Sequence, residues 1–197
     1  MNIFYLDQDP ERCAEYHCDK HSSKMCVEYA QMLSTAHRVL DGEMWIGQNR
    51  VGRSLKRWFL EDGVMNHSLY KASHINHPSN VWVRQSDSNY EYLYKLWKAL
   101  CKEYSHRYNR IHLSWEKLHS ALIIPPEKIK SGEFTEPPPA MKAYPHCIIK
   151  GDSITSYQHF YWEDKREFAK WTNRNKPTWW IEYEQGIRTP PSKCVTN

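Results

Sequence analysis

The chain has 197 residues and a formal net charge of +4, from 27 Lys and Arg against 23 Asp and Glu. Trp, Tyr and Phe make up 14% of the residues, a share that argues against an intrinsically disordered chain. No apolar stretch approaches the ~20 residues of a membrane-spanning helix, and no signal-peptide pattern is present. We therefore expect a cytoplasmic protein that does not associate with membranes and whose six cysteines are reduced.

The first predicted element is a long helix over residues 10–40, preceded by a short apolar segment. Asp9 supplies an N-cap side chain, Pro10 suits the first helical position, and no helix breaker follows until Asp41-Gly42. At helical periodicity one face is apolar and is expected to face the core. A neighbouring face is polar and rich in titratable groups, formed by His17, His21, Lys24, Glu28, Gln31 and Thr35.

The middle of the chain is predicted to begin irregularly and then return to helix. Residues 42–76 contain four glycines, so we expect irregular structure with one short helix near residues 53–60. His77-Pro78 marks the start of a long helix over residues 79–108. A further helix is expected over residues 115–122, with Ser114 as its N-cap.

The last third of the chain opens with a loop, because six of the 11 prolines fall between residues 125 and 150. A helix capped by Asp152 or Ser153 is predicted to run to about residue 171, and a short aromatic helix or turn begins at Pro177. These patterns predict a mainly α fold. We expect a compact, single helical domain over residues 1–185, which includes the proline-rich loop at 125–150, and a flexible tail at 186–197.

The polar face of the first helix is one candidate site, because a carboxylate beside imidazoles suits acid–base chemistry. His17 and His21 also have the i, i+4 spacing of helical zinc sites, with Cys13, Cys18 and Cys26 nearby. The glutamate of the zinc-protease motif is absent, however, since Cys18 follows His17. A metal-dependent enzyme that uses these two histidines therefore stays open as an alternative.

The segment from Gly47 to Ser54 has the glycine spacing of a phosphate-binding loop, but Arg53 stands where that motif has lysine. Such a loop also needs a buried strand before it, and the preceding residues are poor evidence for one. Nucleotide binding is the least favoured interpretation.

The C-terminal region is locally basic and aromatic. Residues 165–176 carry five cations and a single glutamate, a local surplus of four positive charges. Cations contact phosphates and aromatic faces stack on exposed bases, so we predict DNA contacts here from Lys170, Arg174, Lys176, Trp179 and Trp180. One of the two adjacent tryptophans is expected to face a partner, because a short element can hardly bury both. His17 and Lys24 are predicted to extend this contact surface.

Two of these features together resemble a known family. Asp19-Lys20-His21, followed seven positions after the histidine by Glu28, is similar to the signature helix of the phage endonuclease V type pyrimidine-dimer DNA glycosylases. That family also has a basic, aromatic segment near its C-terminus, similar to residues 176–183 here. Its members are small and α-helical, and their chains start directly before the signature helix.

The resemblance implies a DNA glycosylase with AP-lyase activity that needs no cofactor and acts on double-stranded DNA containing a lesion or modified base. In the family the terminal α-amine attacks C1′ of the damaged nucleotide, a Schiff base forms, and β-elimination cuts the strand. Carried over, Glu28 is the catalytic carboxylate and His21 its helper. Because the large Asn2 usually leaves the initiator methionine in place, the amine is that of Met1. Val27 stands where the family has an arginine, so Lys24 is a candidate for that cation.

Two other classes of function remain beside this one. A helical protein that binds nucleic acid or another partner without catalysis would use the basic, aromatic C-terminal region alone. A metal enzyme would use His17 and His21. The three are distinguished by where the Met1 nitrogen lies relative to Glu28, and by whether the two histidines share a site.

Overall fold

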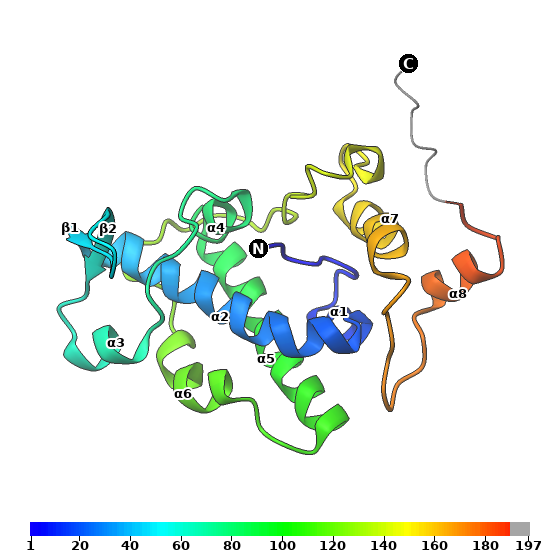
Figure 1. Cartoon of the computed structure of the whole chain (residues 1–197), viewed down its shortest axis with the longest axis horizontal. Helices are drawn as coiled ribbons and strands as arrows, with labels where there is room; N and C mark the ends of the chain where they lie inside the picture. Colours follow the sequence, from blue (N-terminus) through cyan, green and yellow to red (C-terminus); the bar gives the residue numbers. More distant parts are fainter. Residues whose placement is uncertain (190–197) are drawn as a thin grey trace.

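The computed structural model describes residues 1–189 and confirms the mainly helical fold (Figure 1). The helices within that part are α1 (Pro10–Tyr16), α2 (Asp19–Asp41), α3 (Gly63–Ser68), α4 (Pro78–Val83), α5 (Asp87–Tyr108), α6 (Leu113–Leu122), α7 (Ser153–Lys165) and α8 (Thr178–Glu184). Two strands, β1 (Glu43–Gln48) and β2 (Ser54–Phe59), form an antiparallel hairpin. None of the helices described combines the length and apolar composition needed to cross a lipid bilayer.

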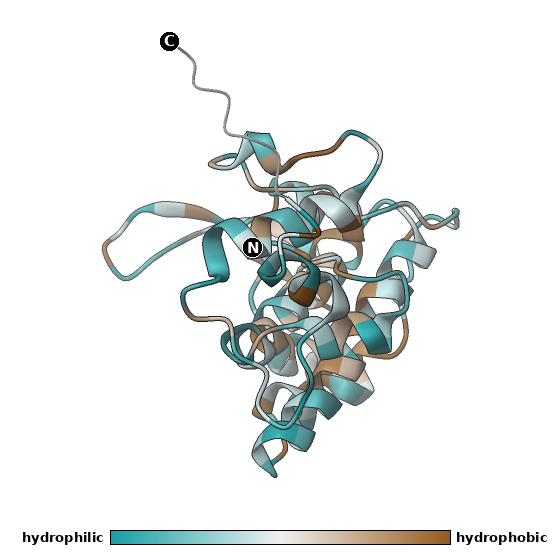
Figure 2. Ribbon diagram, turned by 90° about the vertical axis from the view of Figure 1, so that its right-hand side faces the viewer, coloured by the Kyte–Doolittle hydropathy of each residue, from teal (hydrophilic) through white to brown (hydrophobic). Residues whose placement is uncertain are grey.

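The hairpin corrects the prediction for residues 42–76, where no strand and a helix near 53–60 were expected. Glu43 pairs with Phe59 and Gln48 with Ser54, and the Asn49 side chain closes the turn by accepting the backbone N–H groups of Val51 and Arg53. The phosphate-loop interpretation is therefore wrong, because the glycine-spaced segment forms the turn of an exposed antiparallel hairpin and is followed directly by strand β2 instead of a helix. Figure 2 shows the hairpin projecting sideways from the helical body.

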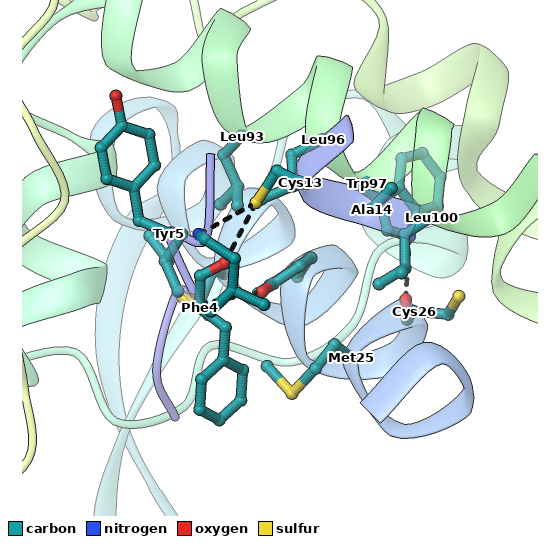
Figure 3. Close-up of a cluster of buried hydrophobic side chains, with 14 of the residues drawn as sticks. Phe4, Tyr5, Cys13, Ala14, Met25, Cys26, Leu93, Leu96, Trp97 and Leu100 are labelled. Carbon is teal, nitrogen blue, oxygen red and sulfur yellow. Dashed lines mark hydrogen bonds between the residues drawn. The ribbon is translucent and has the colours of Figure 1, made fainter. Parts of the chain in front are cut away.

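The N-terminal segment is extended and buried rather than loose. Ile3 and Leu6 are fully buried in a core that also contains Met25 of α2 and Leu93 and Trp97 of α5 (Figure 3). The backbone N–H of Phe4 donates to the Tyr29 hydroxyl at 3.1 Å, and the N–H of Leu6 donates to the Cys13 sulfur at 3.3 Å. These bonds fix the path of the segment, and thus the place of Met1 against α2.

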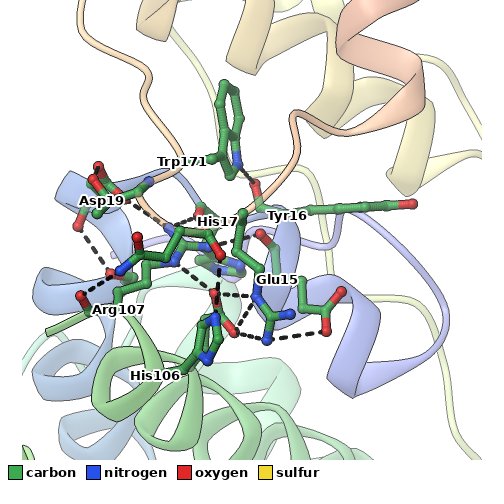
Figure 4. A network of polar contacts seen from close by, with 12 residues as sticks. Glu15, Tyr16, His17, Asp19, His106, Arg107 and Trp171 are labelled. Carbon is green, nitrogen blue, oxygen red and sulfur yellow. Dashed lines mark hydrogen bonds and ion pairs between the residues drawn. The ribbon is translucent and has the colours of Figure 1, made fainter. Parts of the chain in front are cut away.

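The predicted helix over residues 10–40 is two helices, α1 and α2, separated by the extended backbone of His17 and Cys18. Asp9 caps α1 as predicted. The break is held by Arg107 of α5, whose guanidinium donates to the carbonyl oxygens of His17 at 2.8 Å and Glu15 at 2.9 Å (Figure 4). Because carbonyls that a continuous helix would use internally are taken by Arg107, a contact distant in sequence ends α1.

The later elements follow the prediction with shifted ends. The helix expected over 79–108 is α4 and α5, since Ser86 caps a new helix by accepting the N–H of Asn89. His112 caps α6, rather than Ser114. Asp152 caps α7, which ends at Lys165 instead of residue 171. The proline-rich segment is a loop with one 3-10 turn, Pro145–Cys147, and α8 is the short aromatic helix that Pro177 predicts.

The start of the predicted tail is folded. The backbone N–H groups of Ile187 and Arg188 donate to the carbonyl oxygen of Glu182, and the Arg188 guanidinium pairs with the Glu182 carboxylate at 3.5 Å. Residues 186–189 therefore turn back onto α8, and the rest of the predicted tail lies outside the described residues.

Candidate active site

The N-terminal amine lies beside the carboxylate of α2, as the family resemblance implies. The nitrogen of Met1 is 4.0 Å from Oε2 of Glu28. The Met1 side chain is only 5% exposed, although the residue as a whole is only partly buried. The exposed surface of Met1 therefore belongs mainly to its main-chain atoms, which include the amine. The structure thus brings together an accessible amine and a carboxylate that is 17% exposed.

The first turn of α4 holds Met1 in this position. Ser79 Oγ donates to the Met1 carbonyl oxygen at 3.4 Å, and the Asn80 amide contacts the Met1 sulfur at 3.7 Å. The same amide donates to the carbonyls of Ser73 and His74 at 3.1 Å, and His74 has a positive φ of 48°. Sequence reasoning missed these contacts, because the helix-start pattern at residues 77–78 indicates a cap and says nothing of a partner at the other end of the chain.

His77 is a further titratable group at this place. Its Nδ1 accepts the N–H of Ser79 at 3.2 Å and so caps α4. Burial lowers the pKa of His77, the positive charge of the N-terminal amine lowers it further, and Glu28 acts in the opposite direction. The imidazole therefore lies within electrostatic reach of both members of the amine–carboxylate pair.

Lys24 supplies a second cation to Glu28. Its Nζ is 3.2 Å from Oε1, one helical turn away on α2, and its side chain is 61% exposed. Each carboxylate oxygen thus faces one nitrogen, that of Met1 or that of Lys24. Lys24 is therefore a cation in contact with Glu28, and its role as the replacement for the family's arginine stays a prediction.

His21 is buried in the aromatic core instead of facing Glu28. Its ring stacks on Phe4 at 4.3 Å between centroids, and Nδ1 hydrogen-bonds the Tyr161 hydroxyl. Burial lowers the pKa of His21 to about 2, helped by the nearby His17 and lysine charges. The predicted acid–base role is corrected on this ground, since a ring that stays neutral and enclosed does not exchange protons. We expect His21 to position Phe4, and through it the N-terminal segment.

His17 is also internal, which makes the predicted DNA contact wrong. Its side chain is fully buried, with Nδ1 2.7 Å from the Cys13 carbonyl oxygen and Nε2 2.8 Å from the Tyr29 hydroxyl. The two histidines of the metal alternative thus hydrogen-bond different tyrosines. Across residues 1–189, no group of three His, Cys, Asp or Glu side chains is placed to hold a metal ion.

The buried His17 makes stability depend on pH. Burial lowers the pKa of His17 to about 4, whereas an unfolded histidine titrates near 6.5. The unfolded chain therefore binds the proton first, so this contribution is complete above pH 6.5 and is lost as pH falls toward 4. The amide of His17→Gln keeps a donor and an acceptor but does not titrate. Between pH 6.5 and 4 we therefore expect the variant to lose less stability than the parent, by at most a few kcal/mol in the free energy of unfolding, so its melting temperature should fall less steeply with pH. The same decrease in melting temperature for both proteins between pH 7.5 and 4 would contradict this.

In the basic, aromatic C-terminal region, more of the side chains are buried or paired within the protein than the sequence predicted. Trp179 and Trp180 are 6% and 3% exposed, packed against each other and the aromatic side chains of α7, so the expectation that one faces a partner is wrong. Arg174 is bound to Glu103 at 2.8 Å, and Lys176 pairs with Glu184 at 2.7 Å. Lys170 is exposed and is the predicted cation that remains open to a ligand.

The fold and this site define a helical protein that presents a candidate amine nucleophile beside a carboxylate. A model of the family described as pyrimidine dimer DNA glycosylase matches residues 1–117, more than half of the chain, including Met1 and Glu28. The chain belongs to the pyrimidine dimer DNA glycosylase family. Members of this family are enzymes that bind damaged DNA and remove bases from it. No curated protein and no solved structure matches the chain significantly.

Proposed function

We propose that this glycosylase is also an AP lyase that attacks C1′ of a damaged or modified nucleotide in double-stranded DNA with the α-amine of Met1. The observation that carries the proposal is the 4.0 Å pair between that amine and Glu28. α-Amines ordinarily lose their proton about two pH units below lysine side chains, so a terminal amine is the better nucleophile near neutrality.

In the proposed reaction the neutral amine forms a bond to C1′ while the glycosidic bond breaks, and the base leaves with the bonding electron pair. Opening of the sugar ring gives the imine. Loss of the C2′ proton then breaks the C3′–O bond, the 3′ phosphate leaves, and water hydrolyses the remaining imine. Glu28 accepts and returns protons at the amine nitrogen and stabilises its cationic forms. Lys24 restrains the carboxylate from its other oxygen.

The damaged nucleotide has to leave the base stack before the Met1 amine can reach C1′, so we infer that the enzyme acts on an extruded nucleotide. A substrate that is already mispaired or distorted lowers the cost of extrusion. Support for a DNA partner comes from the family and from exposed cations such as Lys170.

The test is borohydride trapping on a duplex with one abasic site. The imine is expected to be reduced to a stable protein–DNA adduct, seen as a band of retarded mobility, and strand cleavage should occur without added metal. An unmodified duplex of the same sequence serves as control. If the protein binds the abasic duplex but yields neither adduct nor cleavage, the AP-lyase proposal is wrong and the glycosylase works without an imine on Met1.

A further inference from the structure

The β1–β2 hairpin exposes apolar side chains that the protein itself does not cover. Trp45 is 54% exposed, Ile46 60% and Phe59 52%, and Val51 at the turn is 75% exposed. Both faces of β1 are open, since Gly47 is its single buried residue. A two-stranded hairpin is at best marginally stable alone, and an exposed apolar group of this kind usually marks an interaction surface.

The hairpin is also basic, with cations that the protein leaves unneutralised. Residues 43–59 contain Arg50, Arg53, Lys56 and Arg57 against Glu43 alone, and Lys71 lies in the adjoining segment. None of these five cations forms a salt bridge within residues 1–189, whereas Arg174 and Lys176 in the C-terminal region both do. Unpaired cations beside apolar side chains are complementary to the phosphates and sugars of nucleic acid.

A surface hollow of about 370 Å³ joins the hairpin to the segment at Lys71. Trp45, Lys56, Arg57 and Phe59 line it from the hairpin. Its lining combines cations with aromatic rings, so it can receive a backbone phosphate while the rings contact the adjoining sugars.

Arg38 of α2 fixes the base of the hairpin. Its buried guanidinium donates to the carbonyl oxygens of Trp58 at 3.0 Å, Leu69 at 2.8 Å and Tyr70 at 2.7 Å, and to both oxygens of Asn66. The hairpin and the segment across the hollow are thereby attached to the same helix that carries Glu28. A pre-organised surface avoids much of the ordering cost of binding.

The distance along α2 suits one continuous duplex. Asp41, the last residue of α2, is thirteen positions after Glu28 and lies two residues before the hairpin begins; at 1.5 Å per residue this is about 20 Å along the helix. With base pairs 3.4 Å apart, about six base pairs cover that length. Figure 1 shows the hairpin at the end of α2, away from α7 and α8.

We propose that the β1–β2 hairpin is a DNA-contacting arm that grips the duplex about six base pairs from the lesion. Backbone phosphates are bound by Lys56, Arg57 and Lys71. The major groove of DNA admits a two-stranded ribbon, and Trp45 and its apolar neighbours lie in it. The proposed role of the hairpin rests on the proposed DNA substrate. It is tested by measuring DNA binding, which does not require strand cleavage.

The test compares Lys56→Gln/Arg57→Gln with a matched control, Lys98→Gln/Lys117→Gln, which removes two exposed lysines from α5 and α6. Dissociation constants are measured by fluorescence anisotropy on two duplexes with a central abasic site. One has at least ten base pairs on each side of the site, and the other has only about three, too few to reach the arm.

For the long duplex, we expect the hairpin variant to bind about tenfold or more weakly and the slope of log Kd against log salt to fall by nearly two. On the short duplex the variant should bind like the parent, and the control should match the parent on both. Trp45→Ala should also weaken only long-duplex binding. Equal affinity of parent and hairpin variant for the long duplex would overturn the proposal. So would a dimer that Trp45→Ala converts to a monomer, because the arm would then bind a second copy. Trapping and cleavage, measured separately, report on the proposed function alone.

Discussion

Glu28→Gln is expected to lower the rate of strand cleavage at an abasic site by about 10²- to 10⁴-fold, the usual contribution of a positioned acid–base group. The amide has the shape of the carboxylate but neither takes up a proton nor carries the charge that faces the Met1 amine at 4.0 Å. The side chain lies at the edge of the site, 17% exposed, so the fold should tolerate the change. Single-turnover cleavage of a labelled abasic duplex measures the effect.

Binding must be measured alongside cleavage to give that result its meaning. The dissociation constant of Glu28→Gln for the abasic duplex is expected to stay at or below that of the parent, because the variant removes a negative charge from the proposed DNA-binding site. Glu116→Gln, an exposed carboxylate on α6, is the matched control and should cleave normally. Parent-like cleavage by Glu28→Gln would remove the carboxylate from the mechanism.

Arg107→Ala is expected to destabilise the protein by about 3–5 kcal/mol, the range for breaking a buried ion pair by removal of one partner. The guanidinium is fully buried and bonds Glu103 at 2.6 Å, Asp19 at 3.0 Å and the two carbonyls at the α1–α2 break. Burial alone would raise the pKa of Glu103, but hydrogen bonds from Arg174 and Arg107 outweigh it and lower the pKa. The variant thus leaves buried acceptors unpaired.

In thermal unfolding followed by circular dichroism, this corresponds to a melting temperature lower by about 10 °C. The control is Lys102→Ala, which removes an exposed pair with Glu11 at 4.0 Å and should change the melting temperature very little. A shift of Arg107→Ala no larger than that of the control would show that the network does not hold the break between α1 and α2.

The local signals in the sequence predicted several elements of the fold, including the helix that carries Glu28. The helix that carries Glu28, the cap at Asp9 and the aromatic helix after Pro177 follow from residue spacing and capping chemistry. The resemblance to the family added the expectation that Met1 lies near Glu28, which the 4.0 Å pair agrees with. Periodicity alone could not supply that expectation, because the first residues are extended and carry no helical pattern.

What the sequence did not reveal depends on long-range contacts. The break at residues 17–18 has no local breaker and is held by Arg107, about 90 positions away. The helical periodicity predicted that His17 and His21 lie on a polar surface. It cannot show that Tyr29 and Tyr161 supply hydrogen bonds to these two rings inside the core. The sequence did not predict the hairpin, because a strand that is exposed on both faces lacks the alternation of apolar and polar residues. The aromatic residues 45, 58 and 59 around a turn at 49–52 were the signal available for it.

The α-amine of Met1 is the proposed nucleophile that forms the imine, and the direct test is to locate the sugar adduct. After borohydride trapping on an abasic duplex, nuclease and protease digestion followed by tandem mass spectrometry should find the reduced sugar remnant on the nitrogen of residue 1. Lys24 is the rival nucleophile, since its Nζ lies 3.2 Å from the same carboxylate. An adduct on Lys24, or on any lysine in place of Met1, would contradict the account.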